Sequence, residues 1–118
     1  MINEKIQNVL SRLEKDIDYE TKHLDEIPSE IRLNCISKNI GMFYNILLKS
    51  INAKNILEIG MSVGYSGVWF ADAVMSNKQF DGQIITIDRE KFKIERARQN
   101  FEEAGANSLI KIRECEAR

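Results

Sequence analysis

Two acids and a set of glycines in the middle of the sequence are the residues best suited to ligand chemistry. Glu58 lies in a short apolar run that ends at Gly60. Gly64 and Gly67 follow before a second apolar stretch, and Asp88 closes the next apolar run. An apolar strand, a glycine-rich turn and a helix start are how α/β proteins hold nucleotide-like ligands. Carboxylates accept hydrogen bonds from hydroxyl and ammonium groups. These residues therefore predict a site for a ligand of that kind.

The surrounding pattern predicts alternating strands and helices that position this site. Strand, helix, strand, helix, strand is typical of a parallel sheet with right-handed crossovers. We expect an α/β, Rossmann-like half of a doubly wound fold, with strand order 3-2-1. The expected strands span 56–59, 83–87 and 109–112, and the expected crossover helices span 66–76 and 90–104.

Two helices are expected ahead of the sheet. Apolar residues recur at helical spacing from Ile2 to Ile17 and again over 39–51. We expect one domain over 1–118, with helices in 1–52 and the β-α-β-α-β unit in 53–118. The second helix carries an apolar stripe, whose members are Ile40, Phe43, Tyr44, Leu47 and Leu48.

Composition excludes several classes of partner. Seventeen basic and eighteen acidic residues give a net charge of −1, which disfavours nucleic acid or an anionic membrane as a partner. No apolar run approaches the roughly 18 residues that span a bilayer, and the N-terminus lacks a signal-peptide layout. Cys35 and Cys115 have no metal-binding or redox spacing. We expect reduced thiols, a cytoplasmic protein and no metal site in these residues.

The loop fits three kinds of site, of which a hydrolase fits worst. Gly60-x-Ser62-x-Gly64 matches the nucleophile elbow of α/β-hydrolases. That mechanism needs an acid and then a histidine later in the chain, whereas His23, the only histidine, lies upstream.

A dinucleotide site and an S-adenosylmethionine (SAM) site fit better. Ser62-x-Gly64-x-x-Gly67 is one glycine short of the dinucleotide pattern, and Asp88 follows at about the distance expected of a ribose-binding acid. That interpretation leaves Glu58 unexplained. In a SAM site Glu58 lies near the positively charged amino-acid end, and Asp88 binds the ribose. We favour SAM, with an NAD-type domain and a non-catalytic binding or assembly module as alternatives.

Longer stretches resemble the class I SAM-dependent O-methyltransferases of the catechol and caffeoyl-CoA type. The matching pieces are LEIGMSVGYSGVWFADAV, GQIITIDRE, ARQNFEEAG and IKIRECEAR, all within 37–118. The resemblance implies SAM as the cofactor and covers about the first half of a family member.

The resemblance also implies which residues bind the cofactor. Gly60 and Met61 would contact SAM through their backbone, and Ser66 would donate its hydroxyl to the carboxylate end. Arg89 would lie next to the adenine. The family's Gly-Asp-Ala at the adenine edge corresponds here to 115–117, in which a cysteine replaces the glycine. The complete predicted set is Ile36, Glu58, Gly60, Met61, Ser62, Gly64, Tyr65, Ser66, Asp88, Arg89, Glu116 and Ala117.

The family's catalytic groups fall outside the matched half. Its metal-binding acids and catalytic lysine follow a fourth strand, so a divalent metal is expected only in a complete family member. We expect this chain to be a truncated methyltransferase, inactive alone, whose complete form methylates a small-molecule hydroxyl. Without a fourth strand the first strand is an open edge, which invites pairing with another chain. We expect a homo-oligomer through that edge, or N-terminal helices that cover it.

Overall fold

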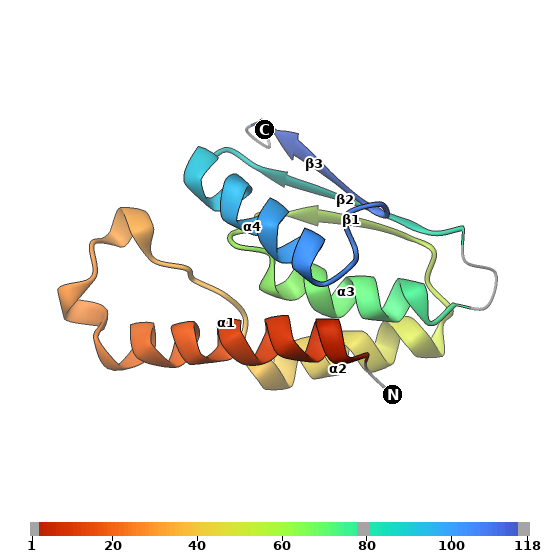
Figure 1. Ribbon diagram of the computed structural model, residues 1–118, viewed down its shortest axis with the longest axis horizontal. Helices are drawn as coiled ribbons and strands as arrows, with labels where there is room; N and C mark the ends of the chain where they lie inside the picture. Colours follow the sequence, from red (N-terminus) through yellow and green to blue (C-terminus); the bar gives the residue numbers. More distant parts are fainter. Residues whose placement is uncertain (1–2, 78–80, 116–118) are drawn as a thin grey trace.

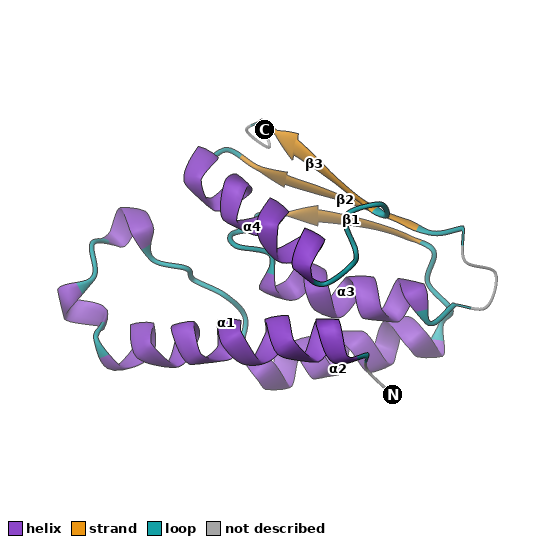
Figure 2. Ribbon diagram, in the orientation of Figure 1, coloured by secondary structure: helices purple, strands orange, loops and turns teal. Residues whose placement is uncertain are grey.

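The computed structural model describes residues 3–77 and 81–115, which form a three-stranded sheet with helices along one side (Figure 1). Figure 2 shows the same division, with the strands together and the helices beneath them. Two short 3₁₀ turns, Leu24–Glu26 and Ser29–Ile31, separate the first two helices. The helices are α1 (Glu4–Lys22), α2 (Lys38–Ser50), α3 (Tyr65–Met75) and α4 (Lys91–Glu103), and the strands are β1 (Asn55–Ile59), β2 (Gln83–Asp88) and β3 (Ile110–Glu114).

The sheet is parallel throughout, with order β1-β2-β3, as predicted. Helices α3 and α4 are the two crossovers. Alternate residues of β2 point toward these helices, so Ile84 and Thr86 are fully buried. The register pairs Glu58 with Thr86, and the carboxyl ends of β1 and β2 therefore meet at one edge of the sheet.

The core lies between the sheet, α3, α4 and the buried face of α1. Helix α1 begins after Asn3, whose side chain accepts the backbone N–H of Ile6 at 2.9 Å and caps the first turn. Its apolar residues recur every three or four positions and bury one face, as predicted. They belong to one buried core cluster with Val68 and Trp69 of α3 and Ala97 and Phe101 of α4; the α1 members are Ile6, Val9, Leu10 and Leu13.

Most of the apolar stripe of α2 is not buried against the rest of the domain. Helix α2 packs on α3 through Gly41 and Asn45 and through one residue of the stripe, Tyr44, whose ring lies edge-on to Phe70 at 6.1 Å. A Cβ on Gly41 would lie 2.4 Å from the Trp69 indole nitrogen, so only glycine permits that approach. Asn45 donates to the Trp69 carbonyl at 2.8 Å and to the Asp72 carboxylate at 2.9 Å. The apolar stripe therefore faces outward: Ile40, Phe43, Tyr44 and Leu47 are exposed, and only Leu48 is half-buried.

Strand β1 forms one edge of the sheet that the structure describes. Leu57 and Ile59 are each 65% exposed there. The N-terminal helices do not cover them, because α1 and α2 pack against α3 and lie on the far side of it from the sheet (Figure 1). In the described part of the chain, no helix is long and apolar enough to cross a membrane.

Candidate ligand-binding site

The loop between β1 and α3 leaves a backbone surface open at Gly60. Gly60 has a φ of +89°, which glycine adopts without steric cost. Its N–H donates to the Ile87 carbonyl at 2.9 Å and holds the start of the loop against β2. A Cβ built on Gly60 would meet no atom within 4 Å. The space beside this backbone is therefore open to a ligand.

Gly64 and Gly67 have a different role, because their missing side chains make room for Phe101 of α4. A Cβ on Gly64 would lie 2.7 Å from the Phe101 ring, and one on Gly67 would lie 2.9 Å from it. Gly64 also has a φ of +90° and is the N-cap of α3. These two glycines join the loop to α4 rather than opening it to a ligand.

Asp88, at the end of β2, is held by three backbone donors. One oxygen accepts the N–H of Ser62 at 2.9 Å, and the other accepts those of Arg89 and Glu90 at 2.7 and 3.1 Å. A carboxylate offers about four acceptor positions. Asp88 is half-buried, so it is oriented by the protein and retains about one position for a ligand donor.

Glu58, on β1, is held by two hydroxyl groups. Thr86 donates to one oxygen at 2.8 Å, and Ser66 donates to the other. Burial raises the pKa of the Glu58 carboxyl; the two hydroxyl bonds oppose this shift, and the charge of Asp88 adds to it. A cation that binds beside Glu58 would favour its ionised form.

The Ser66 hydroxyl has one proton, and it is directed at Glu58. Donation to a ligand carboxylate, as the sequence predicts, requires the hydroxyl to turn away from Glu58. The backbone N–H groups at the start of α3 lie beside it and carry the positive end of the helix dipole. An anionic ligand group at this position would be stabilised by the helix end even without the hydroxyl.

The remaining predicted residues lie in three different environments. Met61 and Tyr65 are buried in the core, and the Tyr65 hydroxyl donates to Glu14 at 2.8 Å, so only their backbone can face a ligand. Ile36 is half-buried against the core. Arg89 is exposed just after β2. Glu116 and Ala117 lie outside the described residues.

Comparison with known proteins identifies the family. The family model for O-methyltransferases matches residues 9–118. This chain belongs to the O-methyltransferase family. A catechol O-methyltransferase of Niastella koreensis is 37% identical over 78 residues, which are 66% of this chain and 34% of that protein. Caffeoyl-CoA O-methyltransferase 5 of Nicotiana tabacum is 37% identical over 95 residues, which are 79% of this chain and 38% of that protein.

Solved structures of the family have the same fold. An O-methyltransferase from Bacillus cereus, in complex with SAH, aligns at a TM-score of 0.66 and 26% identity, over 95% of this chain and 43% of that one. An O-methyltransferase from Streptomyces achromogenes involved in tomaymycin synthesis, in complex with SAM, aligns at 0.65 and 26% identity, over 93% and 42%. The chain thus spans well under half the length of these family members.

Two groups that support Glu58 and the loop between β1 and α3 were absent from the sequence prediction. Thr86 supports Glu58, and the pairing of these residues in the sheet register was a usable signal, since Thr86 interrupts an apolar strand. The Leu33 carbonyl accepts the Ser62 hydroxyl at 2.5 Å. No sequence pattern indicated that contact, because Leu33 lies in an irregular segment far from the loop in sequence.

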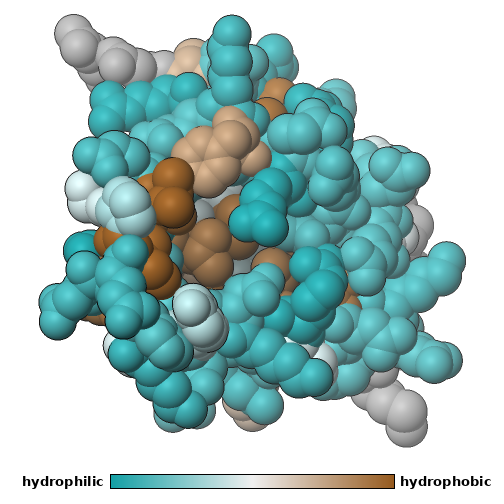
Figure 3. Space-filling model, turned by 60° about the vertical axis from the view of Figure 1, so that its left-hand side comes forward, coloured by the Kyte–Doolittle hydropathy of each residue, from teal (hydrophilic) through white to brown (hydrophobic). Residues whose placement is uncertain are grey.

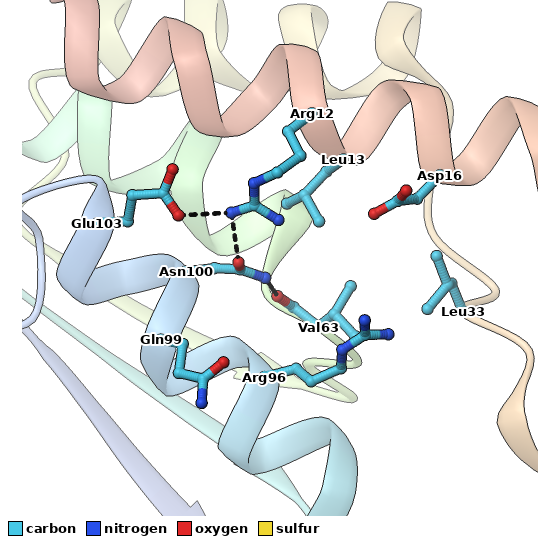
Figure 4. Close-up of a pocket in the computed structure, with 9 residues that line it drawn as sticks. All are labelled: Arg12, Leu13, Asp16, Leu33, Val63, Arg96, Gln99, Asn100 and Glu103. Carbon is cyan, nitrogen blue, oxygen red and sulfur yellow. Dashed lines mark hydrogen bonds and ion pairs between the residues drawn. The ribbon is translucent and has the colours of Figure 1, made fainter.

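A polar cavity of about 160 Å³ lies between α1 and α4, on the helix side of the loop (Figure 4). Arg12 bonds Glu103 and Asn100 across it, at 2.8 and 2.7 Å.

Figure 3 shows a face on which hydrophobic side chains gather near the centre, surrounded by hydrophilic ones. Within residues 3–77 and 81–115, no cluster of His, Cys, Asp and Glu side chains suits a metal ion.

Proposed function

We propose that this chain supplies the SAM-binding part of an O-methyltransferase that methylates a small-molecule hydroxyl. The observation that carries the proposal is the arrangement around Gly60: an open backbone surface, with Glu58 and Asp88 at the carboxyl ends of adjacent parallel strands beside it. Ligands of open α/β sheets bind at such strand ends. Family membership and relatives in complexes with SAM and SAH support the same ligand.

The residues present fit the parts of SAM. Gly60 allows the backbone to approach the ligand, Asp88 accepts a ribose hydroxyl, and Glu58 attracts the ammonium of the amino-acid end, directly or through water. Met61, Ser62, Gly64, Tyr65 and Ser66 complete the loop by backbone groups. The other residues that we propose to bind SAM are Ile36, Arg89, Glu116 and Ala117. SAM supplies an electrophilic methyl group on a sulfonium centre. This chain's residues bind and orient it.

Calorimetric titration with S-adenosylhomocysteine (SAH) and, separately, with NAD tests this assignment. We expect saturable heat with SAH, little with NAD, and a loss of SAH affinity of at least tenfold in Asp88→Ala. Asp18→Ala, an exposed acid on α1 that pairs with Lys22, is a control of the same charge change. Heat with NAD but none with SAH would assign the site to dinucleotides instead.

Self-association through β1 is part of the same proposal. Leu57 and Ile59 expose apolar surface at an edge whose backbone groups can pair with a second strand. Two copies of β1 related by a two-fold axis would join their sheets in antiparallel fashion. Light scattering after size-exclusion chromatography, over a range of concentrations, measures the mass; a constant monomer mass contradicts this part.

We also propose a cytoplasmic location. Cys35 and Cys115 are both free of disulfides, as expected of thiols in a reducing compartment. Fractionation of cells that express the tagged chain tests this part. Recovery in the membrane or secreted fraction contradicts it.

A further inference from the structure

A buried acid on α1 holds the segment that leads into α2. Glu20 is only 9% exposed, and it accepts the backbone N–H of Leu33 at 2.5 Å and that of Asn34 at 3.3 Å. A buried carboxylate is costly unless such donors satisfy it. Because both donors belong to backbone, Glu20 fixes the path of the chain at 33–34 relative to α1.

The same segment contacts the ligand loop. The Leu33 carbonyl accepts the Ser62 hydroxyl at 2.5 Å, and the Ser62 N–H donates to Asp88 at 2.9 Å. Asn34 and Ser62 are both non-glycine residues with left-handed backbone, at φ values of +48° and +50°. Such conformations persist only where the surroundings hold them. A continuous series of contacts thus runs from Glu20 through Leu33 and Ser62 to the acid proposed to bind ribose.

Two further contacts join α1 to this loop. Glu14 accepts the Tyr65 hydroxyl at 2.8 Å. Arg12 donates to Asn100 at 2.7 Å, and Asn100 in turn donates to the Val63 carbonyl at 2.8 Å (Figure 4). Helix α1 is therefore linked to the loop residues Ser62, Val63 and Tyr65, by Arg12 and Glu14 within one turn and by Glu20 further along the helix.

We propose that α1 sets the ligand-binding shape of the 60–66 loop, with Glu20 as a positioning residue that acts through Leu33 and Ser62 on Asp88. The proposal rests on the function proposed above, because it assigns Glu20 to the same site. Glu20 itself touches no proposed ligand group. Its effect is transmitted by backbone hydrogen bonds and by one serine hydroxyl.

Hydrogen exchange of the ligand-free chain tests the positioning role without any ligand. Glu20→Ala should accelerate exchange of amides in 33–36 and 60–66, whereas amides of β3 and the middle of α4 should not change. Glu20→Gln keeps one acceptor and should give a smaller effect, which keeps the test valid if the alanine variant unfolds. Asp18→Ala lies on the same helix, exposed, and should leave the loop unchanged.

Affinity for SAH then tests the link to the site. We expect Glu20→Ala to weaken binding on the order of tenfold, which lies within the usual range of coupling between sites. Glu20→Gln should weaken SAH binding less than Glu20→Ala does. In a double-mutant cycle, Ser62→Ala should cost less in the Glu20→Ala background than in the wild type, because both changes break one series of contacts.

The outcomes separate the two proposals. Failure of the wild-type chain to bind SAH overturns the proposed function, while the exchange experiment still decides whether Glu20 shapes the loop. Normal SAH affinity in both Glu20 variants, or unfolding midpoints that fall without any local change at 60–66, contradicts the positioning role. Additive effects of Glu20→Ala and Ser62→Ala would also overturn it.

Discussion

The backbone N–H of Ser62 donates to the carboxylate of Asp88 at 2.9 Å. This bond joins the glycine loop that follows β1 to the end of β2. It holds Asp88 in place from the loop side, while Arg89 and Glu90 hold it from the start of α4. The acid proposed to bind ribose is therefore oriented before any ligand arrives, which lowers the entropic cost of binding.

Asp88→Asn should weaken both SAH binding and the fold. The amide keeps one oxygen acceptor but loses the charge and one acceptor, and hydrogen bonds to charged groups contribute about 1.5–3 kcal/mol. We expect a loss of affinity of roughly tenfold or more, measured by calorimetry. The urea midpoint should also fall, because the amide cannot accept all three backbone N–H bonds that Asp88 accepts, so affinity is measured where the variant is folded. Unchanged affinity would remove Asp88 from the site.

Glu58→Gln should flatten the dependence of stability on pH. The pKa of Glu58 is raised above the ordinary value of 4.5, chiefly by burial. Between that value and the raised one, the folded state binds more protons than the unfolded state, so stability falls as pH rises through this window. The glutamine variant lacks this proton linkage. Urea unfolding across the acidic range measures it.

The control for this experiment is Glu95→Gln, an exposed acid on α4. It makes the same change in net charge, and its free energy of unfolding should depend on pH as that of the wild type does. A wild-type slope in Glu58→Gln as well would show that Glu58 does not cause the pH dependence.

Gly67→Ala and Gly60→Ala should separate packing from binding. The Cβ of the first would lie 2.9 Å from the buried Phe101 ring, and overpacking of this kind costs about 1–3 kcal/mol. The Cβ of the second meets no atom, although its φ of +89° disfavours alanine by about 1–2 kcal/mol. We expect Gly60→Ala to lose SAH affinity even under conditions in which the variant is fully folded.

Phe101→Leu provides the rescue that completes the comparison. It removes the ring edge and should recover part of the stability lost in Gly67→Ala, as the denaturant midpoint will show. Equal SAH affinity in Gly60→Ala and the wild type would contradict the assignment of the open backbone surface to the ligand.

Charges on the β1 edge should reduce self-association. Leu57→Lys and Ile59→Lys place ammonium groups on side chains that are each 65% exposed, so neither should cost much folding stability. Lysine on an edge strand opposes pairing with another strand. We expect the concentration-dependent mass to fall to that of a monomer. If the double variant associates as the wild type does, the contact lies elsewhere, and the exposed stripe of α2 is the next surface to test.

Much of the architecture was predictable from local pattern. The order of three parallel strands followed from alternating apolar runs and helices, and the meeting of Glu58 and Asp88 followed from the shared edge of parallel strands. The packing of α2 was not predictable in this way. Its pattern indicates a helix but not its neighbour. The contacts with α3 come from Gly41, Asn45 and Tyr44 rather than from the whole apolar stripe.

The support of the loop was also hidden from the sequence. Glu20 contacts Leu33 and Asn34 through their backbone, and Ser62 contacts the Leu33 carbonyl. Backbone partners place no demand on residue type, so they leave no motif. Only the three-dimensional path of the segment after α1 brings these groups together.

The most direct test of SAM binding at this loop is a titration of the isotope-labelled chain with SAH, followed by amide NMR. We predict saturable shifts that cluster at 60–66 and 88–90 and are absent in Asp88→Ala. Shifts confined to the cavity between α1 and α4, or no shifts at millimolar SAH, would contradict the proposal.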